Sequence, residues 1–269
     1  MTNKFFLLSL LFASLYLTGY AQIRVQGVTN DASNHIVKYV SIGIKDKGVG
    51  TVSNEQGVFF LVIPDSLKNE YLTFNHVGYN TIQLLPEVVN KNSVIKLEEK
   101  ITELSEIAVI PKKTTPKWLK KGFKIPGYAY AKDLGEEWGI HLKIKKQSIV
   151  KQVKFEIKTC AYDSVKIRIN MYKFKSDRQE VGEYLLSEPL YKTVEKSAKS
   201  KNYIVDIPEV ITINQEDILL SFEFVHYSGE GHIYLPVYKG SGYVRETAMA
   251  KLEKTPFNSG LSLLIAVTK

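Results

Sequence analysis

The sequence predicts an all-β protein made of two sandwiches in series: a seven-stranded, immunoglobulin-like β-sandwich followed by a jelly-roll-like β-sandwich. Two observations carry this prediction: apolar residues recur at every second position in short runs, and turn-forming residues separate those runs. A third is the lack of any helix-length amphipathic segment. With 269 residues, of which 44% are hydrophobic, the chain is long enough to build two cores.

Residues 1–21 have the layout of a secretory signal peptide. Lys4 precedes a short apolar stretch at 5–17, and the small residues Gly19 and Ala21 come just before the expected cleavage point after Ala21. Because the apolar stretch is short for a membrane helix, we expect it to be removed rather than kept as an anchor, leaving no transmembrane segment. The protein is then exported to the periplasm, or to the outer membrane or cell surface, and the sequence leaves these locations open.

Residues 22–110 form the first predicted sandwich. Their short runs are separated by turns such as residues 53–57, at an interval that is typical of an antiparallel sandwich. We expect about seven strands, with runs at 36–44, 58–63, 71–75, 81–85, 94–97 and 107–110.

Residues 111–122 are predicted to be a linker. Pro111 and Pro116 cannot donate hydrogen bonds within a sheet, and the lysines between and after them favour a solvated, extended segment. Trp118 lies in this linker and is a candidate either for holding the two sandwiches together or for binding a ligand.

Residues 123–269 form the second predicted sandwich. Between residues 165 and 172, apolar side chains alternate with Lys166, Arg168, Asn170 and Tyr172, so we expect a dry row facing the core and a wet row facing solvent. We expect eight or more strands, including runs at 138–144, 153–157, 202–207, 217–224, 232–237 and 262–267.

Charge and cysteine content narrow the function further. The formal net charge is +8, but the lysines are spread along predicted strand faces, where solvation and protection of sheet edges explain them. An exported chain is not expected to bind nucleic acid, and attraction to anionic envelope polymers is the alternative for the basic excess. The one cysteine, Cys160, excludes an internal disulfide and is expected to be a buried, inert thiol at a strand end.

Several motifs in the first block resemble one family. These are residues 25–28 (VQGV), 50–59 (GTVSNEQGVF), 72–79 (LTFNHVGY) and 104–109 (LSEIAV). In this order they resemble the carboxypeptidase-regulatory-like domain of exported Bacteroidota proteins, over residues 23–110. The resemblance implies a seven-stranded, transthyretin-like sandwich without catalytic residues.

The same module stands at the N-terminus of many TonB-dependent outer-membrane receptors, which carry a transmembrane barrel after it. Here 159 residues follow Ile110 (269 − 110), without an alternating lipid-facing series, so we expect the module without the barrel. The stretch from His76 to Tyr79 departs from the family, which more often has serine or alanine before its Gly-Tyr. The second block resembles the C-terminal sandwich of short members of this group, and that resemblance implies no activity.

The search for catalytic chemistry yields candidates but no assembled motif. His226, Glu230 and His232 would bind a metal ion only if a hairpin brought them together, and ordinary hairpin polar residues are the favoured interpretation. The neighbouring carboxylates Glu136 and Glu137 point to opposite sides of a strand, so they cannot flank one scissile bond. We therefore expect no catalytic residues, no metal and no cofactor.

Aromatic residues supply the candidate ligand-binding residues, which are Trp118, Tyr128 and Tyr130. Exposed rings of this kind can stack on the C–H faces of sugars. Trp138 lies in an apolar row and is expected in the core instead.

Together these features predict an exported, noncatalytic envelope protein that acts as a binding or scaffolding module. The partner is an envelope protein or a glycan. The alternative is a carbohydrate-active or metal-dependent hydrolase domain in residues 123–269. Two carboxylates facing across a cleft, or convergence of His226, Glu230 and His232, would favour the hydrolase.

Overall fold

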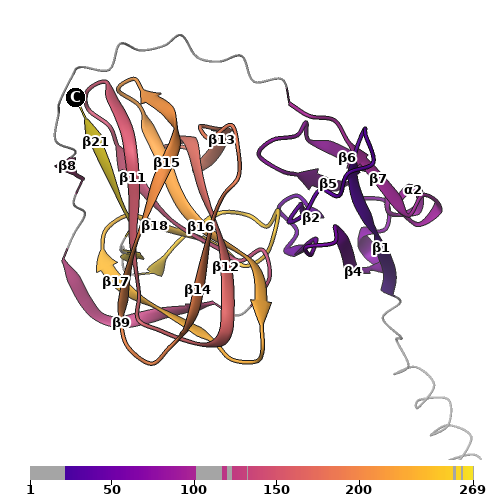
Figure 1. Ribbon diagram of the computed structural model, residues 1–269. Coiled ribbons are helices and arrows are strands. Elements are labelled where there is room, and N and C mark those ends of the chain that lie inside the picture. Colours follow the sequence, from indigo (N-terminus) through magenta and orange to yellow (C-terminus); the bar gives the residue numbers. More distant parts are fainter. Residues whose placement is uncertain are drawn as a thin grey trace, which may run out of the picture.

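A computed structural model describes residues 22–100, 117–119, 123–131, 133–256, 259–261 and 263–268, and confirms the all-β fold (Figure 1). We call residues 22–100 the first module and the described residues from 117 onward the second module. The predicted signal peptide, the predicted strand at 107–110 and most of the predicted linker lie outside the described residues. Among the described residues, no helix is long and apolar enough to cross a membrane.

The first module is a sandwich of a three-stranded and a four-stranded sheet, in the orders β4-β1-β7 and β3-β2-β5-β6. Its strands are β1 (Gln22–Asp31), β2 (Ser41–Ile44), β3 (Val49–Val52), β4 (Val58–Pro64), β5 (Leu72–Asn75), β6 (Ile82–Leu84) and β7 (Val94–Leu97). A short 3-10 helix, η1 (Asp65–Leu67), and a short helix, α2 (Pro86–Lys91), connect strands. Val25, Ile42 and Phe74 are among the fully buried residues of the core between the two sheets.

The first module follows the sequence pattern closely, with one correction. The expected strand at 36–44 is a strand only in its last four residues, β2. Tyr39 has a positive φ of 59°, which breaks the extended backbone just before β2. At Gly57, φ is 72° and the chain passes close to the carbonyl oxygen of Thr29, so this turn requires a residue without a Cβ.

The second module is a larger sandwich of a ten-stranded and a four-stranded sheet. The main path of the ten-stranded sheet is β19-β18-β10-β16-β12-β17-β20, with β13 and β14 paired to β12 and β9 paired to β17, and the four-stranded sheet has the order β15-β11-β21-β8. The strands are β8 (Lys117–Trp118), β9 (Lys124–Ala131), β10 (Glu137–Lys143), β11 (Ser148–Ile157), β12 (Thr159–Lys175), β13 (Glu180–Tyr184), β14 (Leu190–Ser197), β15 (Lys201–Ile213), β16 (Asp217–Ser228), β17 (Ile233–Lys239), β18 (Gly242–Arg245), β19 (Glu253–Lys254), β20 (Ser259–Leu261) and β21 (Leu263–Thr268).

The predicted alternation of core-facing and solvent-facing residues in β12 is confirmed for the core-facing row and wrong for the solvent-facing row. The apolar row from Val165 to Met171 is fully buried in the core between the two sheets. The row expected to face solvent is also buried at Arg168, Asn170 and Tyr172. The first module and the chain segment around residues 243–252 cover this face, so its polar residues contact other protein groups rather than water.

Two other predictions for single residues in the second module are tested directly. Cys160 is buried, its thiol donates to the carbonyl oxygen of Tyr162 at 3.6 Å, and burial raises its pKa. Trp138 is half-buried against the core, and its indole N–H donates to Glu136 Oε1 at 2.6 Å. Both residues therefore have structural roles.

Candidate binding cleft between the two modules

The contact between the modules is built around a buried ion pair on the second module. Arg168, on β12, and Glu223, on the neighbouring strand β16, are cross-strand partners, and their exposed fractions are only 1% and 4%. Arg168 Nε donates to Glu223 Oε2 at 3.1 Å, and Arg168 Nη1 donates to the carbonyl oxygen of Tyr39 at 2.7 Å. Arg168 Nη2 also donates to Ser41 Oγ, whose hydroxyl donates to Glu223 Oε1 at 2.5 Å. The pair is thus hydrogen-bonded to both modules.

A second carboxylate, Glu137 on β10, extends this network. It lies directly across from Glu223 in the β10–β16 pairing, and the Asn170 amide donates to both carboxylates, at 3.1 Å and 3.0 Å. Arg245 Nε forms an ion pair with Glu137 Oε2 at 3.0 Å, and the Ser221 hydroxyl donates to Glu137 Oε1. Each buried carboxylate therefore has its own guanidinium partner.

The surroundings of Glu223 keep its carboxylate ionised. Burial acts to raise the pKa of Glu223, but Arg168 and the donated hydrogen bonds from Ser41 and Asn170 outweigh burial, so the pKa lies below its ordinary value. A carboxylate that stays charged near neutral pH is suited to anchoring an interface. It is not suited to donating a proton as a general acid, which requires a raised pKa.

A group of three residues flanks the buried network, made of the buried Tyr39 and the more exposed Lys166 and Glu55. Lys166 Nζ donates to Glu55 Oε1 at 2.7 Å and to the Tyr39 hydroxyl at 2.8 Å, and that hydroxyl donates to Glu55 at 2.6 Å. Burial, together with the hydrogen bond to Glu55, raises the pKa of Tyr39 to about 12. The ring of Tyr39 packs against Tyr191, with centroids 5.2 Å apart. Tyr39 thus contacts the second module through its ring, its hydroxyl and its backbone.

Glycines allow a loop of the second module to approach the first module closely. The Asp46 N–H donates to Met249 O at 2.9 Å, and Thr247 Oγ1 donates to Gly50 O at 2.9 Å. A Cβ built on Gly50 would lie 2.0 Å from the carbonyl oxygen of Ala248, and one built on Gly43 would lie 2.6 Å from the same atom. Only glycine at these two positions allows the carbonyl oxygen of Ala248 to approach the first module this closely.

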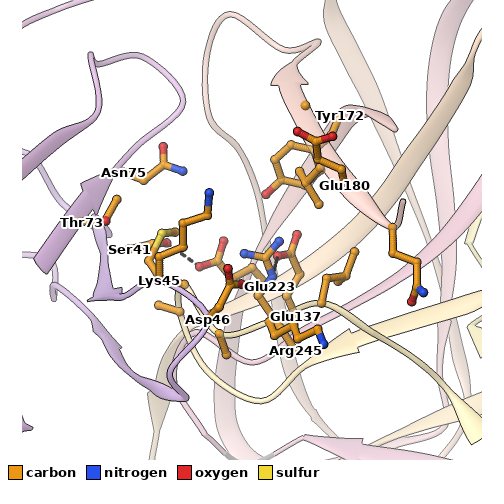
Figure 2. A pocket seen from close by; sticks show the side chains of 18 of the residues that line it. Ser41, Lys45, Asp46, Thr73, Asn75, Glu137, Tyr172, Glu180, Glu223 and Arg245 are labelled. Carbon is orange, nitrogen blue, oxygen red and sulfur yellow. Dashed lines mark hydrogen bonds and ion pairs between the residues drawn. The ribbon is translucent and has the colours of Figure 1, made fainter. Parts of the chain in front are cut away.

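Beside this contact the modules enclose a cleft of about 1020 Å³. Figure 2 shows Ser41, Thr73 and Asn75 on the first-module wall, with Tyr172 and Glu180 across the cleft and Glu137, Glu223 and Arg245 gathered at one end. Five cationic and five anionic side chains line the cleft, so its charge is balanced. A second hollow of about 510 Å³ lies between the modules near His76 and Tyr191. Burial, with Arg168 nearby, lowers the pKa of His76 to about 3, so this imidazole is neutral.

The residues predicted as ligand-binding lie away from the cleft. Tyr128 and Tyr130 are on β9, where they contact Tyr234 of β17. Trp118 is on β8, which pairs with β21 in the four-stranded sheet, so the structure does not bring it together with the two tyrosines.

The weak metal candidates also do not form a metal site in the described part of the chain. Across the ranges that the structure describes, no three His, Cys, Asp or Glu side chains converge as a metal site. His226 is opposite Lys166 in the β12–β16 pairing, and the His232 ring contacts Tyr234 at 4.5 Å. The convergence of His226, Glu230 and His232 that would favour a metal site is therefore not found among the described residues.

Sequence reasoning missed the residues that form the cleft and the network. Glu223 is the only charged residue within the mostly apolar run 218–225, and a lone charge in a buried strand indicates a buried partner. Arg168 belongs to an alternating row that is indistinguishable from an ordinary solvent-facing row. Neither residue could be paired with Ser41 or Tyr39 from sequence, because these lie more than a hundred positions away.

Comparison with known proteins supports the class of the first module. Residues 25–109 match the family model of the CarboxypepD_reg-like domain, so the resemblance seen in the sequence motifs is confirmed for this part of the chain. No curated protein sequence matches the chain.

Two of the solved structures that match the chain are the following. One is described as carbohydrate-binding modules from the β-sandwich superfamily: 11% identity, 79% of this chain and 94% of that chain covered, TM-score 0.24. The other is from infectious bursal disease virus, strain Gx: 9% identity, 91% of this chain and 62% of that chain covered, TM-score 0.25. At these identities and TM-scores, neither structure indicates a function for this chain.

Proposed function

We propose that this protein is an exported, noncatalytic binding protein that holds an extended peptide segment of a partner protein in the cleft between its two modules. The observation that carries the proposal is the cleft itself, which is large, polar and charge-balanced. Pockets for drug-like small molecules are mostly apolar, so this lining is better suited to a ligand that offers hydrogen-bonding groups along its length.

Two strands that line the cleft offer backbone groups to such a ligand. Residues Thr81 and Gln83, at β6, line one wall, and residues 180–182 of β13 line another. Among the described residues β6 pairs only with β5, and β13 pairs only with β12. An extended peptide can pair with an open strand edge through its main chain, while the charged side chains around the cleft select its sequence.

The export prediction and the domain class fit this function. A signal-peptide layout at residues 1–21 directs the chain out of the cytoplasm, and CarboxypepD_reg-like modules carry no catalytic residues in the resemblance described above. The buried network between the modules would hold the two walls of the cleft at a fixed separation.

The hydrolase alternative is favoured by one observation, that Glu137 and Glu223 both line the cleft. These carboxylates lie side by side on neighbouring strands and not on opposite walls, and each is ion-paired with an arginine. The lowered pKa of Glu223 also opposes a role as general acid. Binding without turnover is therefore the better-supported function.

The test is a selection of ligands from a display library of random linear peptides, followed by fluorescence polarisation with the enriched peptides. We expect Gln83→Trp, which fills the cleft, to weaken binding at least about tenfold, the equivalent of ~1.4 kcal/mol. The matched control is Gln26→Trp, on an exposed position of β1 in the same module.

Two results would contradict the proposal. One is that no peptide is enriched, or that enriched peptides bind Gln83→Trp as tightly as the unmodified protein. The other is turnover of chromogenic glycosides that disappears in Glu137→Gln, which would establish the hydrolase instead.

A further inference from the structure

A row of exposed aromatic rings crosses two neighbouring strands of the second module, away from the cleft. Tyr130 lies directly across from Tyr234 in the β9–β17 pairing, and Tyr128 shares the face of Tyr130 because the two are two residues apart. The ring of His232, just before β17, contacts the ring of Tyr234. We call these four residues the tyrosine row, and none of them lines the cleft. In Figure 1, β9 and β17 lie on the side of the second module that is remote from the first module.

The rings support one another but do not fill the core. The ring centroid of Tyr234 is 4.6 Å from that of Tyr128, 6.5 Å from that of Tyr130 and 4.5 Å from that of His232, with the rings at steep angles to one another. Tyr128 and Tyr130 nevertheless remain 58% and 55% exposed. The ring contacts therefore fix the geometry of the row while leaving much of its surface open.

Strand alternation explains why these rings have no structural role inside the sandwich. The intervening residues of β9, Ala129 and Ala131, are buried, as are Ile233 and Leu235 of β17. The core on that side is complete with small and aliphatic residues, so the tyrosines face outward. Exposed rings of this size that the core does not need indicate a binding surface.

We propose that the tyrosine row is a carbohydrate-binding surface that stacks against a neutral polysaccharide chain. The C–H faces of a pyranose pack on aromatic rings, while the tyrosine hydroxyls can hydrogen-bond to sugar hydroxyls. The cation on the same strand as Tyr128 and Tyr130 is already paired, because Lys124 forms an ion pair with Glu156 at 3.1 Å. An uncharged ligand matches this environment better than a nucleic acid or an acidic polymer does. Alternate residues on a strand lie about 7 Å apart, so the rings of β9 can contact successive parts of one chain.

The test is affinity electrophoresis through native gels that contain xyloglucan, hydroxyethyl cellulose, mannan or dextran, with polygalacturonate as an anionic comparison. We expect at least one neutral polysaccharide to retard the protein. The double variant Tyr128→Ala/Tyr130→Ala should bind it at least about tenfold more weakly. Tyr128→Phe/Tyr130→Phe should retain most of the binding, because it keeps the rings.

Two controls distinguish binding at the tyrosine row from binding at any exposed tyrosine and from binding in the cleft. Tyr71→Ala removes a tyrosine that is equally exposed, at 55%, on the first module, and should leave retardation unchanged. Gln83→Trp, which fills the cleft, should also leave it unchanged, so the result does not depend on the proposed peptide binding. Circular dichroism verifies that each variant is folded.

Each of the following results would overturn the proposal. No neutral polysaccharide retards the protein; retardation is equal in the alanine double variant; or only polygalacturonate binds. A fourth contrary result would come from analytical ultracentrifugation. A dimer of the unmodified protein that is lost in the alanine double variant would show that the tyrosine row binds a second copy of the chain and not a carbohydrate.

Discussion

Replacing Arg168 by methionine tests whether the buried network is what holds this structure together. Methionine fills much of the same space but removes the guanidinium that contacts Glu223, Tyr39 and Ser41. Glu223 would stay buried, with only the hydroxyl of Ser41 and the amide of Asn170 as donors. Removing one partner of a buried ion pair costs about 3–5 kcal/mol, since the remaining charge is uncompensated.

The assay is urea denaturation followed by tryptophan fluorescence and by far-ultraviolet circular dichroism. The chain contains two tryptophans, Trp118 and Trp138, and both lie in the second module. Fluorescence therefore reports the unfolding of the second module, while circular dichroism reports both modules. We expect Arg168→Met to lower the free energy of unfolding by about 3–5 kcal/mol in fluorescence. The two transitions should also separate, because the first module loses two of its buried contacts.

The matched control is Lys196→Met, which breaks the exposed ion pair with Asp163 on the same module. Exposed pairs contribute ~0–1 kcal/mol, so this variant should be close to the unmodified protein. Adding Glu223→Gln to Arg168→Met should recover part of the loss, because the buried charge is then removed. A loss below ~1 kcal/mol for Arg168→Met, with coincident transitions, would refute the reasoning.

Two further predictions concern acid and the glycine contact. The pKa of Glu223 is lowered in the folded protein, so its ionised carboxylate stabilises the fold. This stabilisation is fully present above the ordinary pKa of 4.5 and is lost as the pH falls through the lowered pKa, so the free energy of unfolding should decrease in acid. Equilibrium unfolding between pH 7 and 3 should show a shallower decrease in Glu223→Gln, and an identical slope would contradict this. Gly50→Ala places a Cβ against Ala248 O and should destabilise the contact between the modules by about 1–3 kcal/mol. Gly78→Ala, at a glycine without a positive φ where a Cβ would meet only contacts at 3.9 Å, is the steric control, and equal losses in the two variants would show that close approach is not the cause.

The strand pattern was predictable because sandwich cores impose a period of two on the sequence. Val165, Ile167 and Ile169 lie in the core for this reason. The same pattern cannot say what covers the opposite face. A polar row looks alike whether it faces water or a polar surface of another module, and only the fold places Tyr39 and Ser41 against Arg168.

The candidate sites show the same limit. Tyr128 and Tyr130 alternate with alanines, so their outward direction follows from the sequence, but Tyr234 is more than a hundred positions away and only sheet pairing brings it beside them. Trp118 is close to the tyrosines in sequence, yet it belongs to the other sheet. The departure of β2 from its predicted start also depends on one backbone angle, at Tyr39.

The buried charges between the modules are distributed unequally. Arg168 and Glu223 both belong to the second module, and the first module contributes only a serine hydroxyl and a backbone carbonyl oxygen to that pair. If the two modules separated, Arg168 and Glu223 would remain paired on the second module and would become exposed to solvent together. Neither module would then carry an unpaired charge from this pair. Separating the modules would therefore not require separating buried opposite charges, and the contacts that would be lost are the apolar packing of Tyr39 and Val52 against Val225 and Ala248 and the hydrogen bonds of Arg168 to Tyr39 and Ser41.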